Sequence, residues 1–189
     1  MNWLEQLKHN RLLREIRART SRTSPPNPDR PISLETAATV AICFAADDIG
    51  ERKYVLKLAE RLKKRGGRVD LLAYLEVPID ANDGQLSCPT FSRKEKNWFG
   101  WPKSGRVDDF RERPVDLLLC LTPQPSLLFD AIAATKPAAI KVGWYSDRPG
   151  LVTPYHLNID LPQPAKFAAL VEQAEYILNK TTEPEPAMA

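Results

Sequence analysis

The sequence predicts a three-layer α/β domain, in which a mostly parallel sheet of five strands lies between helices, preceded by a basic N-terminal helical arm. Two observations lead to this fold class. Short, continuous apolar runs that suit strands buried on both faces alternate along the chain with amphipathic stretches of helical period. The 189 residues also suffice for one hydrophobic core, in a domain over 32–182 with appendages at 1–31 and 183–189.

The arm, residues 1–31, is predicted to be a basic helix followed by a linker. Residues 1–22 contain no Gly or Pro and are rich in Leu, Arg, Lys and Glu, which favour helices. The apolar residues fall on different sides of this helix, in two groups: Leu12, Leu13 and Ile16, and Trp3, Leu4 and Leu7. We therefore expect the helix to dock on the domain at one end and to be solvated at the other. Four prolines predict an extended linker over 20–31.

The first half of the domain is predicted to be a strand–helix–strand unit. The apolar run 39–44 is the first strand, and Asp48 starts a helix that continues to about residue 65. Gly66 and Gly67 end this helix, and 69–75 is the second strand. A unit of this kind joins two parallel strands with a right-handed crossover.

The second half repeats this order after a long, irregular insert at residues 77–113. Loops of this length often carry function. We expect strands at 115–121, 139–143 and, at an edge of the sheet, 157–161. Helices are expected from Thr122 and Pro123 to about residue 135 and over 165–180, and the tail 183–189 is disordered by composition. This order is typical of flavodoxin-like and Rossmann-like sheets, whose ligands bind beyond the carboxyl ends of the strands.

Composition excludes several classes of protein. No apolar run reaches the roughly 18–20 residues of a membrane-spanning helix, and no secretory signal is visible, so we expect a cytoplasmic protein. Cys43, Cys88 and Cys120 are odd in number and widely spaced, which disfavours a disulfide framework. No Cys/His cluster is present, so no zinc site is expected, and only the thiol of Cys88, in the insert, is a candidate for reactivity.

The motifs of catalysis and cofactor binding are missing. No Gly-x-Gly-x-x-Gly follows the first strand and no P-loop is present, so we expect no cofactor. Asp47 and Asp48 form a candidate acidic pocket, but Asp48 and Glu51 also have the spacing of a helix capping box. His156, the only histidine in the domain, is interpreted as a loop residue. The sequence therefore favours a protein that is not an enzyme.

The insert combines aromatic and basic side chains. Trp98, Phe99 and Trp101 could stack the bases of single-stranded nucleic acid, form a lid over a sugar or nucleotide, or fold back as a small cluster over the sheet edge. These three interpretations stay open. The candidate partner-binding residues of the insert are Arg93, Lys94, Lys96, Asn97, Trp98, Phe99, Trp101, Lys103 and Arg106.

Positive charge is concentrated in the arm. Residues 1–31 hold seven Lys or Arg and three acids, a net charge of +4, and since the whole chain carries +3 the remainder carries −1. This asymmetry indicates an anionic partner, such as RNA phosphates or a ribosome surface, although a basic helix packed on its own domain has the same composition. The candidate residues are Lys8, Arg11, Arg14, Arg17, Arg19 and Arg22.

Two resemblances rest on particular stretches. The chain resembles a small family of uncharacterised bacterial proteins, from residue 1 to about residue 180. The resemblance rests on Trp-Phe-Gly-Trp-Pro at 98–102, the strand 115–121 and Ala-Ala-Ile-Lys-Val-Gly at 138–143. This resemblance implies a basic N-terminal helix and an α/β domain without an assigned activity. About 30 residues, 116–145, are also similar to the acceptor-side domain of heptosyltransferase-type glycosyltransferases.

The leading prediction is a non-enzymatic binding or accessory module that contacts RNA or a ribonucleoprotein through the arm and the insert. An alternative is a domain or enzyme, related to half of a glycosyltransferase, that binds a sugar or phosphorylated metabolite. Another is a degenerate receiver-like protein-interaction domain, since Cys120, Leu121 and Thr122 stand where a receiver carries its phosphorylated aspartate. The N-terminal helix could also dock on a partner protein, and no membrane span is expected.

Overall fold

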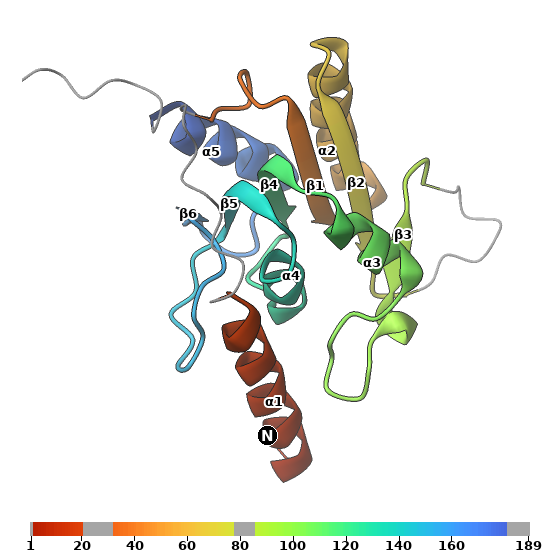
Figure 1. The fold of residues 1–189 in the computed structure, drawn as a ribbon, viewed down its shortest axis with the longest axis vertical. Helices are drawn as coiled ribbons and strands as arrows, with labels where there is room; N and C mark the ends of the chain where they lie inside the picture. Colours follow the sequence, from red (N-terminus) through yellow and green to blue (C-terminus); the bar gives the residue numbers. More distant parts are fainter. Residues whose placement is uncertain (1, 21–31, 78–85, 181–189) are drawn as a thin grey trace, which may run out of the picture.

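The computed structural model of the chain describes residues 2–20, 32–77 and 86–180. The predicted linker from residue 21 onward, Arg22 and the predicted tail lie outside the described residues. The domain is built on a six-stranded sheet with the order β3-β2-β1-β4-β5-β6, and every neighbouring pair of strands is parallel (Figure 1). The strands are β1 (Thr39–Ala45), β2 (Arg68–Leu75), β3 (Thr90–Ser92), β4 (Val115–Leu121), β5 (Ala138–Trp144) and β6 (Leu157–Ile159).

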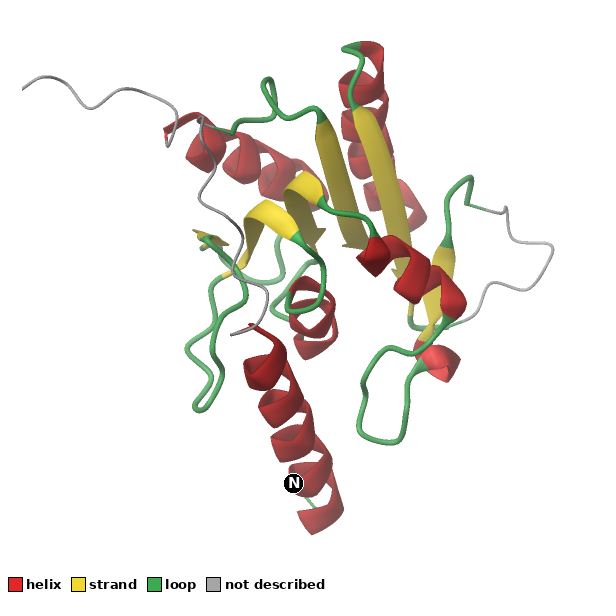
Figure 2. Cartoon of the chain, in the orientation of Figure 1, coloured by secondary structure: helices red, strands yellow, loops and turns green. Residues whose placement is uncertain are grey.

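Helices cover both faces of this sheet, which gives the predicted three layers (Figure 2). Side chains of α2 and α5 share one hydrophobic core with the sheet, and those of α3 and α4 share the other. Burial of these two faces supplies the main driving force for folding. The helices are α1 (Trp3–Thr20), α2 (Ile49–Lys64), α3 (Gly105–Glu112), α4 (Leu127–Ala133) and α5 (Phe167–Lys180), and a short 3-10 helix covers Arg93–Glu95.

The first strand–helix–strand unit forms as the sequence predicts. Five consecutive residues of β1 are buried, as expected for a central strand of a parallel sheet. The Asp48 carboxylate accepts a hydrogen bond from the Glu51 backbone N–H at 3.0 Å, so this aspartate caps α2. Gly66, with φ of 89°, follows the end of the helix in a conformation that side chains disfavour.

The prediction of five strands and an irregular insert is wrong, because the insert contains β3, the 3-10 helix and α3. Three residues of β3 pair with the end of β2, and Phe91 is buried there. Ser104 caps α3 by accepting from the Val107 backbone N–H, and Val107 and Phe110 bury one side of that helix. These elements are too short for a hydrophobic period to reveal them.

The predicted start of α4 at Thr122 is also wrong, because the helix begins at Leu127 after Ser126. The preceding carbonyls serve tertiary contacts instead. The Trp144 indole N–H donates to the Thr122 carbonyl at 2.6 Å, and the Ala165 backbone N–H donates to the Pro123 carbonyl at 2.7 Å. Long-range hydrogen bonds therefore override the local helix-start signal.

The usual ligand crevice of a parallel sheet is crossed by the chain itself. Strands are added first on one side of β1 and then on the other, so the topological switch point lies between the carboxyl ends of β1 and β4. The segment entering α5 spans this edge. Ala165 is bound to Pro123 after β4, and the Phe167 backbone N–H donates at 2.7 Å to the carboxylate of Glu51, at the start of α2. Open space at the carboxyl edge lies to either side.

Helix α1 is attached to the domain by one half only. Leu12, Leu13 and Ile16 are buried, whereas Trp3 and Leu7 are 72% and 48% exposed. This confirms the prediction that the helix docks at one end. Figure 1 shows α1 projecting from the domain, with its N-terminal end farthest away. Among the described residues, no helix is both long and apolar enough to cross a membrane.

Candidate functional site

The basic arm and the aromatic insert meet in the structure. Leu12 and Ile16 of α1 pack against Ala131 of α4 and Ala134 just after it, and Phe99 and Trp101 of the insert join the same cluster. Gly100 lies so close to α1 that a Cβ added to it would sit 3.6 Å from the Leu12 side chain. Two segments far apart in the sequence thus form one surface.

Asn97 holds the turn that presents the aromatic side chains. Its side-chain oxygen accepts hydrogen bonds from the backbone N–H groups of Phe99 at 3.2 Å and Trp101 at 2.9 Å. Its own backbone N–H donates to the Trp101 carbonyl at 2.9 Å, and Gly100, with φ of 90°, closes the turn. The sequence singles out Asn97 as a binding residue, but these bonds show that it also shapes the turn.

The three aromatic residues of the turn have different surroundings. Trp98 is 60% exposed and contacts Phe99 edge to face, with ring centroids 5.3 Å apart. Phe99 and Trp101 are half-buried and covered by arginines, with the guanidinium of Arg19 4.3 Å from the Trp101 ring centroid. Phe99 and Trp101 therefore belong to a small hydrophobic cluster, but this cluster lies between α1 and α4 and not over the sheet edge as predicted. Trp98 remains accessible.

A pocket of about 500 Å³ opens where α1 and the insert meet. Its volume lies in the range of small-ligand sites. Side chains from both segments converge on it, and most of its charged groups are basic, with the exposed Trp98 indole beside them. The lining residues are Glu5, Lys8 and His9 of α1 and Arg93, Lys96, Asn97, Trp98, Phe99 and Gly100 of the insert. We call it the arm–insert pocket.

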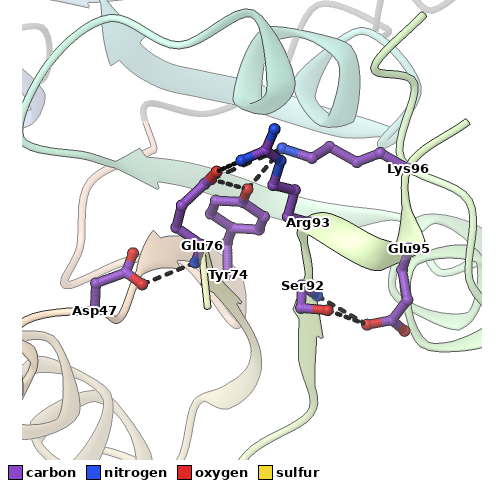
Figure 3. A network of polar contacts seen from close by, with 7 residues as sticks. All are labelled: Asp47, Tyr74, Glu76, Ser92, Arg93, Glu95 and Lys96. Atoms are coloured by element: carbon purple, nitrogen blue, oxygen red, sulfur yellow. Dashed lines mark hydrogen bonds and ion pairs between the residues drawn. The ribbon is translucent and has the colours of Figure 1, made fainter. Parts of the chain in front are cut away.

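A polar network behind the pocket orients two of its cations (Figure 3). The Glu76 carboxylate lies 3.4 Å from Arg93 and 3.9 Å from Lys96, and it accepts a hydrogen bond from the Tyr74 hydroxyl. Lys96 donates to the same hydroxyl at 2.6 Å. The network is anchored to the loop after β1, because the Glu76 backbone N–H donates to the Asp47 carboxylate at 2.8 Å. Asp47 thus positions Glu76.

Burial and charge change the pKa values in this network. Partial burial lowers the pKa of Lys96, and the neighbouring Glu76 carboxylate opposes this effect. Burial raises the pKa of Tyr74, and its hydrogen bond to Glu76 raises it further. The Arg93 side chain, by contrast, is 73% exposed, so its charge is available to a partner in the pocket.

The beginning of the insert turn is fixed by a capping box. The Glu95 carboxylate accepts from the Ser92 backbone N–H at 2.8 Å, and the Ser92 hydroxyl lies 3.4 Å from the same oxygen (Figure 3). The Lys103 backbone N–H donates to the Glu95 carbonyl at 2.8 Å, which closes the turn at its far end. The pocket wall therefore has a defined backbone.

The sequence-predicted site residues separate into those that line the pocket and those that do not. Lys8, Arg93, Lys96, Asn97, Trp98 and Phe99 come together there. Lys94 and Lys103 are exposed outside the lining, and Arg106 donates to the Thr90 carbonyl at 2.8 Å. Within the arm, Arg11 and Arg19 pair with Glu15, and Arg14 and Arg17 are exposed.

The sequence did not single out five residues of the site. Glu5, His9 and Gly100 line the pocket, and Tyr74 and Glu76 form the network behind it. The helical spacing of Glu5, Lys8 and His9 was a usable signal, since residues three or four apart share a face. The position of Glu76 directly after the second strand, at the carboxyl edge of the sheet, was another usable signal. The hydrogen bond between Lys96 and Tyr74 had no such signal, because it depends on the pairing of β2 with β3.

The cysteines and His156 lie in surroundings that do not favour reactivity. Cys43 and Cys120 are buried, and burial raises the pKa of Cys88, which disfavours the reactive thiolate. His156 precedes β6, where its Nδ1 accepts from the Lys141 backbone N–H at 3.0 Å. In the described parts of the chain, no three His, Cys, Asp or Glu side chains are grouped to hold a metal ion.

A second pocket, of about 410 Å³, lies at the carboxyl ends of β4, β5 and β6. Tyr145 is 55% exposed at its side, and the Arg148 guanidinium is held by the Pro125 carbonyl at 3.1 Å. The wall is polar, with two carboxylates and two side-chain amides. It consists of Gln124, Pro125, Tyr145, Ser146, Asp147, Arg148, Asp160 and Gln163.

Fold and site together define a class of protein: a parallel α/β domain with a docked basic helix, in which that helix and an insert line one pocket. Residues 8–180 match a family of unknown function, DUF6913, and the chain belongs to this family. The match confirms the resemblance to an uncharacterised family, and it includes most of α1 with the whole domain. No curated protein and no solved structure matches the chain, and similarity to heptosyltransferases is not shown.

Proposed function

We propose that this protein is a non-enzymatic module that binds single-stranded RNA, free or within a ribonucleoprotein, in the arm–insert pocket. One observation carries the proposal. The two segments that the sequence marks as basic and aromatic line a single pocket, where the exposed Trp98 indole stands among Lys8, Arg93 and Lys96. Single-stranded nucleic acid is held by this combination of a stacking platform and cations.

Each group in the pocket has a role in this function. The Trp98 indole stacks on an unpaired base, which a duplex cannot offer. Arg93 and Lys8 contact the phosphates on either side of that base, and Lys96 is fixed by Tyr74 and Glu76. Glu5 pairs with Lys8 at 3.0 Å and is the group that a phosphate must displace. Affinity is therefore moderate and depends on salt.

The binding test uses fluorescence anisotropy of a labelled single-stranded oligonucleotide at increasing salt. With three cations engaged, log K falls against log salt with a slope of about −2, near −0.7 per phosphate contact. A duplex of the same sequence binds more weakly. Absence of binding at about 50 mM salt, or a slope near zero, contradicts the proposal.

Two substitutions test the roles of Trp98 and Arg93. Trp98→Ala lowers affinity roughly 5- to 150-fold, the range expected for loss of one stacked base, and Trp98→Phe retains most of it. Tyr176→Ala is the matched control, because Tyr176 is 57% exposed on α5. Arg93→Ala reduces the salt slope, whereas Lys64→Ala on α2 leaves it unchanged. Equal losses in the control variants contradict a site in the arm–insert pocket.

A second candidate function is binding of a sugar or other small polyhydroxylated ligand in the pocket beside β5. The exposed face of Tyr145 suits a sugar ring, and the surrounding carboxylates and amides suit hydroxyl groups. Thermal-shift screening with sugars and sugar phosphates tests it, since a ligand at 100 times its Kd adds about 2.7 kcal/mol. Tyr145→Ala abolishes a true shift, whereas Tyr176→Ala preserves it.

A further inference from the structure

Helix α1 carries a stripe of exposed side chains on the side opposite the packed one. Trp3, Leu7, Asn10, Arg14 and Arg17 recur three or four residues apart, so they lie in one row along the helix, and all are exposed. The buried residues Leu12 and Ile16 face α4 instead, and Lys8 and His9 face the arm–insert pocket. We call this row the outer stripe.

The outer stripe has an apolar end and a cationic end. Trp3 is 72% and Leu7 48% exposed, and Leu4, 40% exposed, lies beside them. Arg14 and Arg17 follow toward the C-terminal end of the helix, and among the described residues neither forms an ion pair. Single exposed apolar side chains are normal on a protein surface, but here three large ones are exposed within five residues. Such a cluster marks an interaction site.

We propose that the outer stripe docks α1 on a membrane surface that contains anionic lipids. Tryptophan and leucine insert at the boundary between headgroups and acyl chains, and arginine binds anionic headgroups. A rise of 1.5 Å per residue places Arg14 about 10 Å along the axis from Leu7. A helix that meets the surface obliquely, N-terminal end first, therefore buries Trp3, Leu4 and Leu7 while Arg14 and Arg17 remain at headgroup depth.

The position of α1 permits this docking. The half that carries Trp3, Leu4 and Leu7 projects beyond the domain, so a flat surface reaches it without contacting the sheet (Figure 1). The other half stays packed on α4 through Ile16 and Leu12. The surface is used without unfolding or detaching the helix.

Charge and chemistry favour a lipid surface over a second copy of α1 or an RNA as the partner of the outer stripe. A second copy of α1 offers no acidic residue on its own stripe to meet Arg14 and Arg17, since the acids of the helix, Glu5 and Glu15, are paired with Lys8 and with Arg11 and Arg19. RNA offers phosphates for the arginines but no apolar environment for leucines. A membrane with anionic headgroups supplies both.

The test is co-sedimentation of the full chain with vesicles. We expect binding to phosphatidylcholine vesicles that contain phosphatidylglycerol, and little binding to phosphatidylcholine alone. Trp3→Ser with Leu7→Ser reduces binding at least tenfold. Arg14→Glu with Arg17→Glu also reduces it, since each cation near such a surface contributes roughly fivefold. Lys63→Glu with Lys64→Glu on α2 matches the charge change away from the stripe and leaves binding unchanged.

Two further measurements distinguish this inference from RNA binding. The variant with Trp3→Ser and Leu7→Ser keeps the affinity for RNA, and Trp98→Ala keeps vesicle binding, because the apolar end of the stripe and the arm–insert pocket lie on different sides of α1. Circular dichroism verifies that α1 stays helical in each variant. No binding to anionic vesicles, equal binding to neutral ones, or undiminished binding of the Trp3 and Leu7 variant overturns the proposal. Capture by an acidic protein without vesicle binding also overturns it.

Discussion

At the scale of single residues, the described glycine with the least space around it is Gly143, where Tyr155 covers β5. A Cβ added to Gly143 would lie against Cε1 and Cζ of the Tyr155 ring and 2.7 Å from its Cδ1. Tyr155 is buried and its side chain interacts with the buried Asp130, so displacing the ring disturbs both groups. Gly143 is therefore required by packing rather than by its backbone angles.

Gly143→Ala is expected to lower the free energy of unfolding by about 1–3 kcal/mol or more, because overpacking displaces a buried ring. Urea unfolding followed by circular dichroism measures the change. Gly105→Ala is the control, since a Cβ at this first residue of α3 meets nothing within 4 Å. It is expected to be neutral or to stabilise by up to about 1 kcal/mol. A stable Gly143 variant would contradict the packing argument.

At the scale of elements, α1 depends on few contacts with the domain. Ile16 is fully buried and packs on Ala131 of α4 and Ala134 just after it, and few other residues of α1 are buried. The attachment of α1 determines whether the arm–insert pocket exists, because three of its lining residues belong to this helix.

Ile16→Ala is expected to weaken this attachment by about 2–5 kcal/mol, the usual cost of removing a buried isoleucine side chain. Amide hydrogen exchange then accelerates along α1 while the amides of β1 and β4 keep their protection. Leu7→Ala, at an exposed position of the same helix, changes exchange little. Faster exchange across the sheet would mean that α1 is part of the global folding unit.

The sequence predicted the elements whose patterns are long and local. The apolar runs 39–44 and 115–121 correctly predicted the two central strands, and the helix expected from Asp48 to about residue 65 corresponds to α2. The three residues of β3 carry no detectable period, and they form a strand only because β2 offers them an edge. The Thr122-Pro123 signal failed because Trp144 and Ala165 bind the carbonyls that a helix would have used.

The sequence predicted the two segments that form the candidate site, but it did not predict that they contact each other. Composition identified the basic arm and the aromatic insert, since both depart from the rest of the chain. Their meeting depends on α1 packing against α4, a contact that periodicity cannot specify. For the same reason the separate surroundings of Trp98 and Trp101, neighbours in the sequence, could not be distinguished.

At the scale of the whole molecule, stability depends on pH through a buried carboxylate. Burial raises the pKa of Asp130 from 3.8 to about 6, and Tyr155 and Arg148 oppose this rise. The folded state thus binds the proton more tightly than the unfolded state. The contribution of the Asp130 side chain to the free energy of unfolding is fully present below about pH 4, and it is lost as the pH rises through about 6.

Asp130→Asn is expected to remove this dependence while keeping a hydrogen-bonding partner for Tyr155. Relative to the variant, the natural chain loses on the order of 2–3 kcal/mol of unfolding free energy between pH 4 and pH 7. Unfolding titrations of both proteins at a series of pH values measure the difference. Parallel stability curves for the two chains would show that Asp130 does not titrate in this range.

The segment that ties Ala165 to Pro123 and Phe167 to Glu51 has a consequence for how the fold can diversify. It occupies the crevice at which parallel sheets of this kind usually bind ligands, so the pockets at this edge lie to either side of it. A relative in which that segment took another route would expose the crevice between β1 and β4. The same scaffold could then acquire a central ligand without any change in its strands.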